Sequence, residues 1–399
     1  MKKAVWIILF ISFLVGGVFL LEGFENKKHF IRLLSGEEII AACEEEEDGK
    51  AQKNPPPPED VVKDEPLKDE STTGRENSAI LFDESSLEPA ASSPSGAEII
   101  EREFTWNYGG KQWVYRLQVP QQIYHYFASR ERLPLVHYGV FSIYITDPRH
   151  KEFISALANN FSKAADQEKY SLRQTVELVL AFVQSIEYVT DEISKGLEQY
   201  TRYPLETLVE LQGDCKDKSV LFASILREMG IGTVLVILPG DPGHMAVGIK
   251  GENLPGTYYE YRGARYYYVE TTGQGWQIGW IPPEYRDREA IIVPIESQPL
   301  LIHEGEFKVT SQGQVDLLVT VRNLGTAVAH DTRVYVALDA GEGKAYAQKW
   351  SDPLDIKPDS GGIYTFHLRV PSGIKTRLLI KIISDGYLVN ESTSEWFTV

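Results

Sequence analysis

The sequence is short of cysteine. Only two occur in 399 residues, Cys43 and Cys215, so no disulfide framework can hold a folded core. Metal-ligand patterns are missing too: we find no Cys/His cluster with ligand spacing and no calcium-binding loop. We therefore expect neither a metal nor another cofactor. A lone cysteine in a folded domain is either buried as a small apolar residue or present because it reacts.

Basic residues are also scarce. Lys and Arg total 40 against 57 Asp and Glu, giving a net charge of −17, which argues against a nucleic-acid partner. The excess is concentrated between residues 44 and 88, where 15 acidic residues meet 5 basic ones. That stretch includes Pro55 to Pro58 and almost no aromatic residue, so it cannot bury enough apolar surface to fold. We predict an acidic, Pro-containing linker over residues 23–98 that is largely disordered.

Long apolar runs are absent except at the N-terminus. Two lysines precede residues 4–21, which are 18 uncharged residues, about the length that spans a bilayer. Lysines before the run favour an N-terminus inside the cell. We predict a transmembrane anchor at residues 1–22, in a single-pass protein of the cell membrane with extracytoplasmic domains. A cleaved signal peptide, and hence a secreted protein, is the alternative, although no clear cleavage site follows.

Residues 99–297 combine helical and strand patterns. Aromatic and polar residues alternate around Gly109-Gly110, which predicts a β-hairpin over 102–120. Helical periodicity covers 150–165 and 171–189, and Ser171 with Gln174 forms a capping-box pattern. The second helix has an apolar stripe of Leu172, Val176, Val179, Leu180, Val183 and Ile186.

Strand patterns follow these helices. The apolar run 233–239 is bounded by glycine and proline, which suits a buried strand, and 243–251 and 256–273 alternate like strands joined by turns. Helices first and an antiparallel sheet after predict an α+β domain. From residue 298 the texture changes to short alternating strands between Gly, Asn and Asp turns, about seven in a hundred residues. This predicts an immunoglobulin-like β-sandwich over 298–399.

Cys215 stands where a helix begins. In "GDCKDKSVLFASILREMG", residues 213–230, Asp214 is the expected N-cap, Asp217 completes a capping box and Gly230 ends the helix. Its core stripe is Val220, Leu221, Ile225 and Leu226. Free N–H groups and the helix dipole stabilise a thiolate at such a position. Lys216 adds to this effect, whereas Asp214 and Asp217 oppose it.

A nucleophilic thiol also needs a base and a group that orients the base. His244 lies at the start of an apolar strand pattern in "GDPGHMAVGIKG". Glu270 lies in "YYYVETTG", and alternation places Tyr266, Tyr268 and Glu270 on one strand face. A carboxylate buried there needs a partner. We therefore take Cys215, His244 and Glu270 as the candidate catalytic residues.

Three segments carry a family resemblance: "RYPLETLVELQGDCKDKSVLFASILREMGI", "GHMAVGI" and "YYYVETTG". They resemble the transglutaminase-like superfamily of papain-type cysteine enzymes, most of all its prokaryotic, membrane-associated members, over roughly residues 154–282. The resemblance implies a papain-like α+β core with Cys215 opening a helix and His244 and Glu270 on adjacent strands. The family usually has aspartate where this chain has Glu270. The expected oxyanion donors are the N–H of Cys215 and, by analogy with papain-like enzymes, Gln212.

The resemblance implies an extracytoplasmic acyl-transfer enzyme that acts on peptide or protein amides through a thioester. The thioester would pass to water, which we favour, or to an amine in a cross-linking reaction. The alternative is a catalytically silent transglutaminase-like module that serves binding or adhesion at the cell surface. The expected partners are a peptide or protein substrate at the cell surface and the membrane, through the N-terminal helix.

Overall fold

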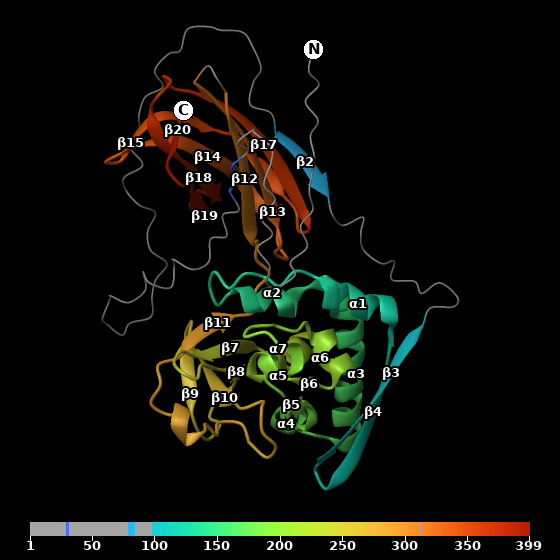
Figure 1. Ribbon diagram of the computed structural model, residues 1–399. Coiled ribbons are helices and arrows are strands. Elements are labelled where there is room, and N and C mark those ends of the chain that lie inside the picture. Colours follow the sequence, from blue (N-terminus) through green and yellow to red (C-terminus); the bar gives the residue numbers. More distant parts are fainter. Residues whose placement is uncertain (1–28, 32–78, 84–97, 311–312) are drawn as a thin grey trace.

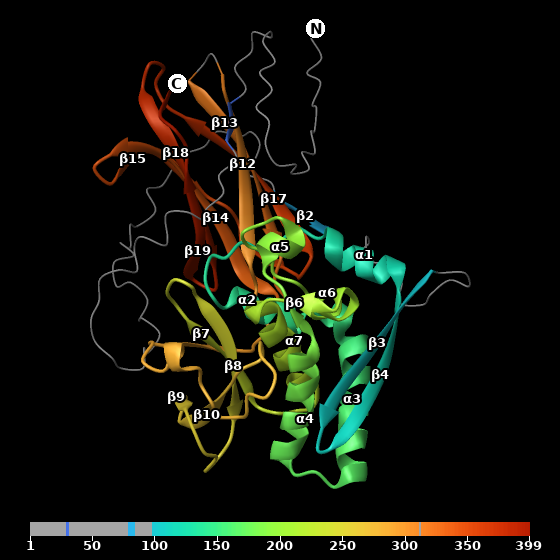
Figure 2. The same ribbon diagram turned by 60° about the horizontal axis from the view of Figure 1, so that its bottom comes forward.

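The computed structural model describes residues 29–31, 79–83, 98–310 and 313–399 (Figures 1 and 2). The predicted anchor at residues 1–22 and most of the predicted linker at 23–98 lie outside these ranges. Within them, no helix combines the length and the hydropathy that a membrane crossing requires.

A long β-hairpin opens the folded chain. Strands β3 (Ile99–Tyr108) and β4 (Lys111–Pro120) pair from Ile99 with Pro120 down to Tyr108 with Lys111. The turn is Gly109-Gly110, and both glycines have positive φ, 61° and 75°, which a residue with a side chain rarely adopts. Phe104 and Trp106 are buried and pack on helix α4, as Figure 2 shows for the two elements. The predicted hairpin is confirmed.

Seven α-helices follow the hairpin in the described part of the chain. They are α1 (Gln121–Ser129), α2 (Val140–Thr146), α3 (Lys151–Glu168), α4 (Leu172–Ser185), α5 (Asp191–Lys195), α6 (Pro204–Glu210) and α7 (Cys215–Glu228). The capping box of α4, Ser171 with Gln174, is present as predicted. Its predicted apolar stripe is buried except at Leu172, which is 63% exposed. Leu172 is the first helical residue and lies beyond the packed turns, so the prediction is wrong for that side chain.

The helices pack on an antiparallel sheet with the strand order β11-β7-β8-β10-β9. Its strands are β7 (Thr233–Leu238), β8 (His244–Lys250), β9 (Tyr258–Tyr261), β10 (Ala264–Val269) and β11 (Ile291–Pro294). Leu235 and Ile237 of β7 join the core shared with the helices, while Val234 and Val236 join a second cluster on the other face. Burial on both faces explains the unbroken apolar run of β7. The α+β prediction is confirmed.

Nine strands make up the C-terminal part: β12 (Leu301–Val309), β13 (Gln314–Asn323), β14 (Ala329–Gly341), β15 (Lys344–Trp350), β16 (Leu354–Ile356), β17 (Ser360–Arg369), β18 (Lys375–Ser384), β19 (Tyr387–Thr393) and β20 (Phe397–Thr398). They form two antiparallel sheets that share one core, to which Val319, Val336, Phe366 and Ile380 contribute. The finer assignment to an immunoglobulin-like sandwich stays a prediction.

Two short strands from the predicted linker complete one of these sheets. Strand β1 (His29–Ile31) pairs with β12, and β2 (Ala79–Asp83) pairs with β17, which gives the order β1-β12-β13-β17-β2. The sequence predicted no strand in this stretch. Their partner strands lie more than two hundred residues further along, so composition around residues 29 and 79 gives no sign of the pairing.

Helix α2 lies between the two folded parts (Figure 1). It is buried along its whole length, and the hydroxyl of its last residue, Thr146, lies 2.7 Å from the hydroxyl of Thr326. Nearby, the Asp359 carboxylate, in the turn before β17, forms ion pairs with Arg130, at 3.2 Å, and with Arg149. These contacts join the C-terminal sheets to the helical layer.

The aromatic cluster on α4 should dominate the stability of the α+β part. Phe182 is fully buried, with its ring centroid 5.1 Å from those of both Phe104 and Trp106. We expect Phe182→Ala to lower the free energy of unfolding by about 3–5 kcal/mol, because it removes this packing and leaves a cavity. Urea unfolding followed by tryptophan fluorescence measures the change. The exposed Leu172→Ala is the matched control, and equal losses in both variants would contradict this description of the core.

Candidate functional site

Cys215 is the first residue of α7, and its position is fixed by the cap of the helix. Asp214 Oδ1 accepts hydrogen bonds from the N–H groups of Lys216, at 3.0 Å, and Asp217, at 3.2 Å. Asp217 Oδ2 in turn accepts one from the N–H of Asp214, at 3.3 Å, so the predicted capping box is confirmed. Gly213 makes room for it, since a Cβ there would lie 2.7 Å from the Cβ of Asp217.

The surroundings of Cys215 leave its backbone N–H free. The first N–H groups of a helix have no acceptor within the helix, and no other acceptor meets that of Cys215 in the described part of the chain. The side chain of Cys215 is half-buried. Partial access to the sulfur and a free N–H beside it are two of the features that attack on an acyl carbon requires.

His244 and Glu270 meet at one edge of the sheet. His244 opens β8 and Glu270 follows the last residue of β10. The two strands are antiparallel neighbours, with Val247 opposite Val269, so the start of β8 and the end of β10 coincide. The Nε2 atom of His244 lies 2.9 Å from Oε2 of Glu270, and Cys215 is close enough to the imidazole to raise its pKa. The structure thus brings together the three residues that the sequence singled out.

Glu270 is held at both oxygens. Its side chain is almost fully buried, and Oε2 also accepts a hydrogen bond from the hydroxyl of Tyr268, at 2.7 Å. Oε1 accepts two from Thr272, from the N–H at 3.0 Å and the hydroxyl at 2.7 Å. Burial alone would raise the pKa of Glu270, but His244 and Thr272 lower it to about 2. Glu270 is therefore an anion at every physiological pH.

The imidazole of His244 is protonated at neutral pH. Burial alone would lower its pKa, but the hydrogen bonds and charges of Cys215 and Glu270 raise it to about 9. Tyr285, in the 3₁₀ turn η4 (Pro283–Tyr285), stacks on the ring with 4.4 Å between centroids and 7° between planes. With Nε2 held by Glu270, Nδ1 is the nitrogen left for the thiol.

Tyr188 lies near the thiol, and Gln212 lies in the strand that pairs with that of Tyr188. Tyr188, in the short strand β5 (Glu187–Tyr188), is half exposed, and burial followed by the charges of Cys215 and Asp214 raises its pKa to about 12. Its phenol is therefore a neutral hydrogen-bond donor. Gln212 lies in β6 (Gln212–Gly213), the parallel partner of β5, and is half-buried. Its side-chain amide makes no hydrogen bond to the described residues, and its role as an oxyanion donor stays a prediction.

Lys216 is bound to carboxylates rather than to the thiol. Its Nζ lies 2.5 Å from Oδ2 of Asp191 and also pairs with Asp214. The fully buried Arg202 bonds with Asp191, at 3.2 Å, and with Asp217, at 2.7 Å. The positive charge expected to help the thiolate is thus shared between two acids. The network instead anchors the first turn of α7 to α5 and to the loop before α6.

The same network contains the one group of carboxylates, among the described residues, with spacing that could hold a metal ion. Oxygen atoms of Asp191, Asp214 and Asp217 lie within 4.8 Å of one another. Lys216 and Arg202 already lie among them, so the chain itself supplies the positive charge that these buried acids require.

Sequence patterns did not identify four side chains around the site: Gln184, Lys218, Ser219 and Tyr285. Lys218 and Ser219 are fully buried on α7, although both are polar. A polar residue on the apolar side of a helix was the available signal. Tyr285 lies in a turn rich in charged residues and gave no signal.

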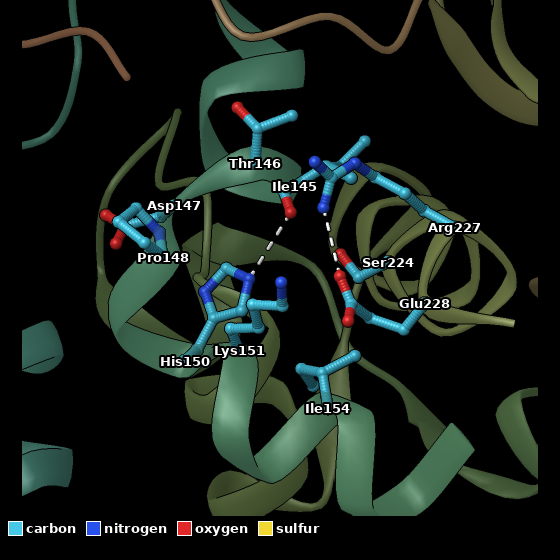
Figure 3. Close-up of a pocket in the computed structure, with 10 residues that line it drawn as sticks. All are labelled: Ile145, Thr146, Asp147, Pro148, His150, Lys151, Ile154, Ser224, Arg227 and Glu228. Atoms are coloured by element: carbon cyan, nitrogen blue, oxygen red, sulfur yellow. Dashed lines mark hydrogen bonds and ion pairs between the residues drawn. The ribbon is translucent and has the colours of Figure 1, made fainter. Parts of the chain in front are cut away.

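A cavity of about 130 Å³ lies at the opposite end of α7 (Figure 3). Ser224 and Glu228 of α7 line it together with His150, whose Nε2 lies 3.4 Å from the carbonyl oxygen of Ile145. At 1.5 Å of rise per residue, these helical residues lie about 14–20 Å along the axis from Cys215. The cavity is therefore separate from the Cys215 site.

Known proteins offer only distant similarities. No family model and no curated protein matches the chain. Among solved structures, Legionella pneumophila LapG (EGTA-treated) is 17% identical over 37% of this chain and 83% of its own, with a TM-score of 0.27. A TGase is 13% identical over 46% and 47%, with a TM-score of 0.25. Red sea bream transglutaminase is 10% identical over 74% and 61%, with a TM-score of 0.22. Similarities this low do not establish a shared fold, so the chemistry of the site follows from its own geometry.

The buried charge network predicts a large stability effect. Arg202→Met leaves the carboxylates of Asp191 and Asp217 buried without their guanidinium partner, so we expect a loss of about 3–5 kcal/mol in the free energy of unfolding. Arg116→Met is the control, because its ion pair with Glu103 is exposed and we expect no measurable change. Denaturant unfolding of both variants tests this, and a small loss for Arg202→Met would mean that the network is not formed.

The titration of His244 is a second test. Its imidazole should keep its proton through neutral pH and release it near pH 9, as followed by side-chain ¹⁵N chemical shifts. Glu270→Gln replaces the anion with a neutral amide, so the midpoint should fall. Glu284→Gln removes an exposed carboxylate from the same turn as Tyr285 and should leave the midpoint unchanged. If the titration midpoint of His244 were the same in Glu270→Gln as in the parent protein, the pairing of His244 with Glu270 would be contradicted.

Proposed function

We propose that this protein is a cysteine-dependent acyl-transfer enzyme with Cys215 as nucleophile, His244 as general acid and base, and Glu270 as the residue that orients His244. The single observation that carries the proposal is that the imidazole of His244 interacts with Cys215 and is hydrogen-bonded to a carboxylate that is held at both oxygens. This is the arrangement that nucleophilic catalysis needs on any fold. It also matches the roles implied by the resemblance of the sequence to the transglutaminase-like superfamily.

Acylation begins from the thiolate–imidazolium pair. The sulfur of Cys215 attacks the carbonyl carbon of an amide, a C–S bond forms, and the carbonyl oxygen takes the negative charge. His244 then donates its Nδ1 proton to the amide nitrogen, the C–N bond breaks, and the amine leaves. Glu270 keeps the imidazole oriented and stabilises its positive charge before the proton is transferred.

Deacylation regenerates the site. The neutral His244 accepts a proton from water as its oxygen attacks the thioester carbon. The C–S bond breaks, a carboxylic acid leaves, and the thiolate–imidazolium pair forms again. An amine in place of water would give a cross-linked amide. We favour water, the more abundant acceptor.

The oxyanion that forms in each half-reaction needs donors. The N–H of Cys215, at the positive end of α7, is one. Gln212, three residues upstream, is the second in this proposal. Both would act on the carbonyl oxygen while the sulfur holds the carbon.

The proposed substrate is an amide of a peptide or protein at the cell surface. The extracytoplasmic location depends on the apolar run at residues 4–21 and remains a prediction from sequence. A silent binding module would keep a groove but would not need an ionised Glu270 paired with His244 beside a thiol. The completeness of the series therefore favours chemistry.

Alkylation of Cys215 by iodoacetamide tests the proposal without a known substrate. In a Cys43→Ala background only one thiol remains. We expect the rate against pH to have a midpoint well below the value of about 8.5 of a free cysteine, because the imidazolium stabilises the thiolate.

His244→Ala should move that midpoint up towards 8.5, and Cys215→Ser should abolish labelling. The exposed His330→Ala is the matched control and should leave the profile unchanged. A wild-type midpoint near 8.5 that His244→Ala does not move would rule out an activated thiol and leave the binding module as the better description.

A further inference from the structure

Lys218 is a fully buried lysine that the proposed mechanism does not use. It lies three residues after Cys215 on α7, and its ammonium group meets three backbone carbonyl oxygens: Ile186 at 2.6 Å, Thr272 at 3.1 Å and Gln184 at 3.5 Å. An ammonium has three N–H donors and no acceptor, so three carbonyls satisfy it. It forms no ion pair with a carboxylate in the described part of the chain.

The three carbonyls belong to two different segments that contact α7. Gln184 and Ile186 form the C-terminal end of α4, where unpaired carbonyls and the negative end of the helix dipole favour a cation. Thr272 lies in the segment that follows β10 and contains Glu270. The ammonium of Lys218 therefore joins α4, α7 and the Glu270 segment at one point.

The segment that contains Thr272 also contacts the carboxylate of Glu270 directly. Thr272, whose carbonyl binds Lys218, donates both of its hydrogen bonds to Oε1 of Glu270. The amide of Gln184 donates to the carbonyl of Glu270 at 2.8 Å. Ser219, the neighbour of Lys218, donates to the carbonyl of Met245, next to His244, at 3.1 Å. The buried polar side of α7 thus contacts the chain beside both partners of Cys215.

We propose that Lys218 is a positioning residue of the Cys215 site: by binding the Thr272 carbonyl it fixes the segment that holds Glu270 against His244. This inference rests on the proposed acyl-transfer function and names a residue that the family resemblance did not supply. Lys218 touches none of the reacting atoms and acts through Thr272 and Glu270.

Packing alone does not account for a lysine here. Burial lowers the pKa of Lys218 to about 8, against the opposing charge of Glu270, so holding the charge at this position is unfavourable. Methionine has a side chain of similar length and would fill the space without that penalty. Unlike methionine, the ammonium group of lysine can bond to carbonyls of α4 and of the Glu270 segment at the same time.

The test is the pH profile of Cys215 alkylation by iodoacetamide in the Cys43→Ala background. We expect Lys218→Met to raise the midpoint in the same direction as Glu270→Gln, because both weaken the imidazolium that stabilises the thiolate. At a fixed pH below the midpoint, the alkylation rate falls about tenfold for each pH unit by which the midpoint rises. The double variant should show no further shift than Glu270→Gln alone, since Lys218 acts through Glu270. Lys250→Met, an exposed lysine at the end of β8, is the control and should change nothing.

Thermal unfolding of each variant separates positioning from stability. A lower melting temperature for Lys218→Met with an unchanged profile would overturn the proposal, because Lys218 would then be structural only. Additive shifts in the double variant would also overturn it, because the charge would then act on the thiolate directly. If Lys218→Met does not fold, Lys218→Gln, which keeps two N–H donors, replaces it under the same criteria. Identical profiles of the parent and Glu270→Gln would instead refute the proposed function itself.

Discussion

The site depends on a buried carboxylate that stays ionised. Glu270 is almost fully enclosed, and a carboxylate in that position is stable only if each oxygen has partners. Tyr268 and His244 supply them on one oxygen and Thr272 on the other. Because this anion persists, the imidazole beside it holds its proton at neutral pH.

Helix α7 brings this electrostatic arrangement to the sulfur. Its first turn is tied down by the charge network through Lys216 and Asp217, while Lys218 and Ser219 face the strands and segments that carry the other two residues. Val220 and Leu221, one turn further, lie in the common core. One helix therefore presents the Cys215 thiol at its start, polar contacts in its second turn and apolar packing beyond, so the position of Cys215 is set by the whole domain.

The candidate catalytic residues could be predicted from local sequence patterns. The contacts that position them could not, because they join residues far apart in the sequence. The cap formed by Asp214 and Asp217, the apolar stripe after it and the strand that begins at His244 follow from spacing and residue type, whereas Glu270, predicted within a strand, lies one residue past the end of β10. The binding of Lys216 by Asp191 joins residues 25 apart with no shared pattern. Strands β1 and β2 find partners in the C-terminal sheets, which composition around residues 29 and 79 cannot reveal. Sequence showed that Lys218 was polar, but its role depends on carbonyls from α4 and from the Glu270 segment.

The use of glutamate, where the similar family usually has aspartate, has a structural explanation. Glu270 stands one residue beyond the last paired residue of β10, so its backbone has already left the strand. The extra methylene of glutamate gives the side chain more rotamers than aspartate has. Unless these rotamers are restricted, the carboxylate does not hold the imidazole in one orientation. Two bonds from Thr272 to Oε1 remove that freedom and leave Oε2 for His244. The stacked ring of Tyr285 packs against the imidazole, so in the proposed site a longer acid can take the place of a shorter one.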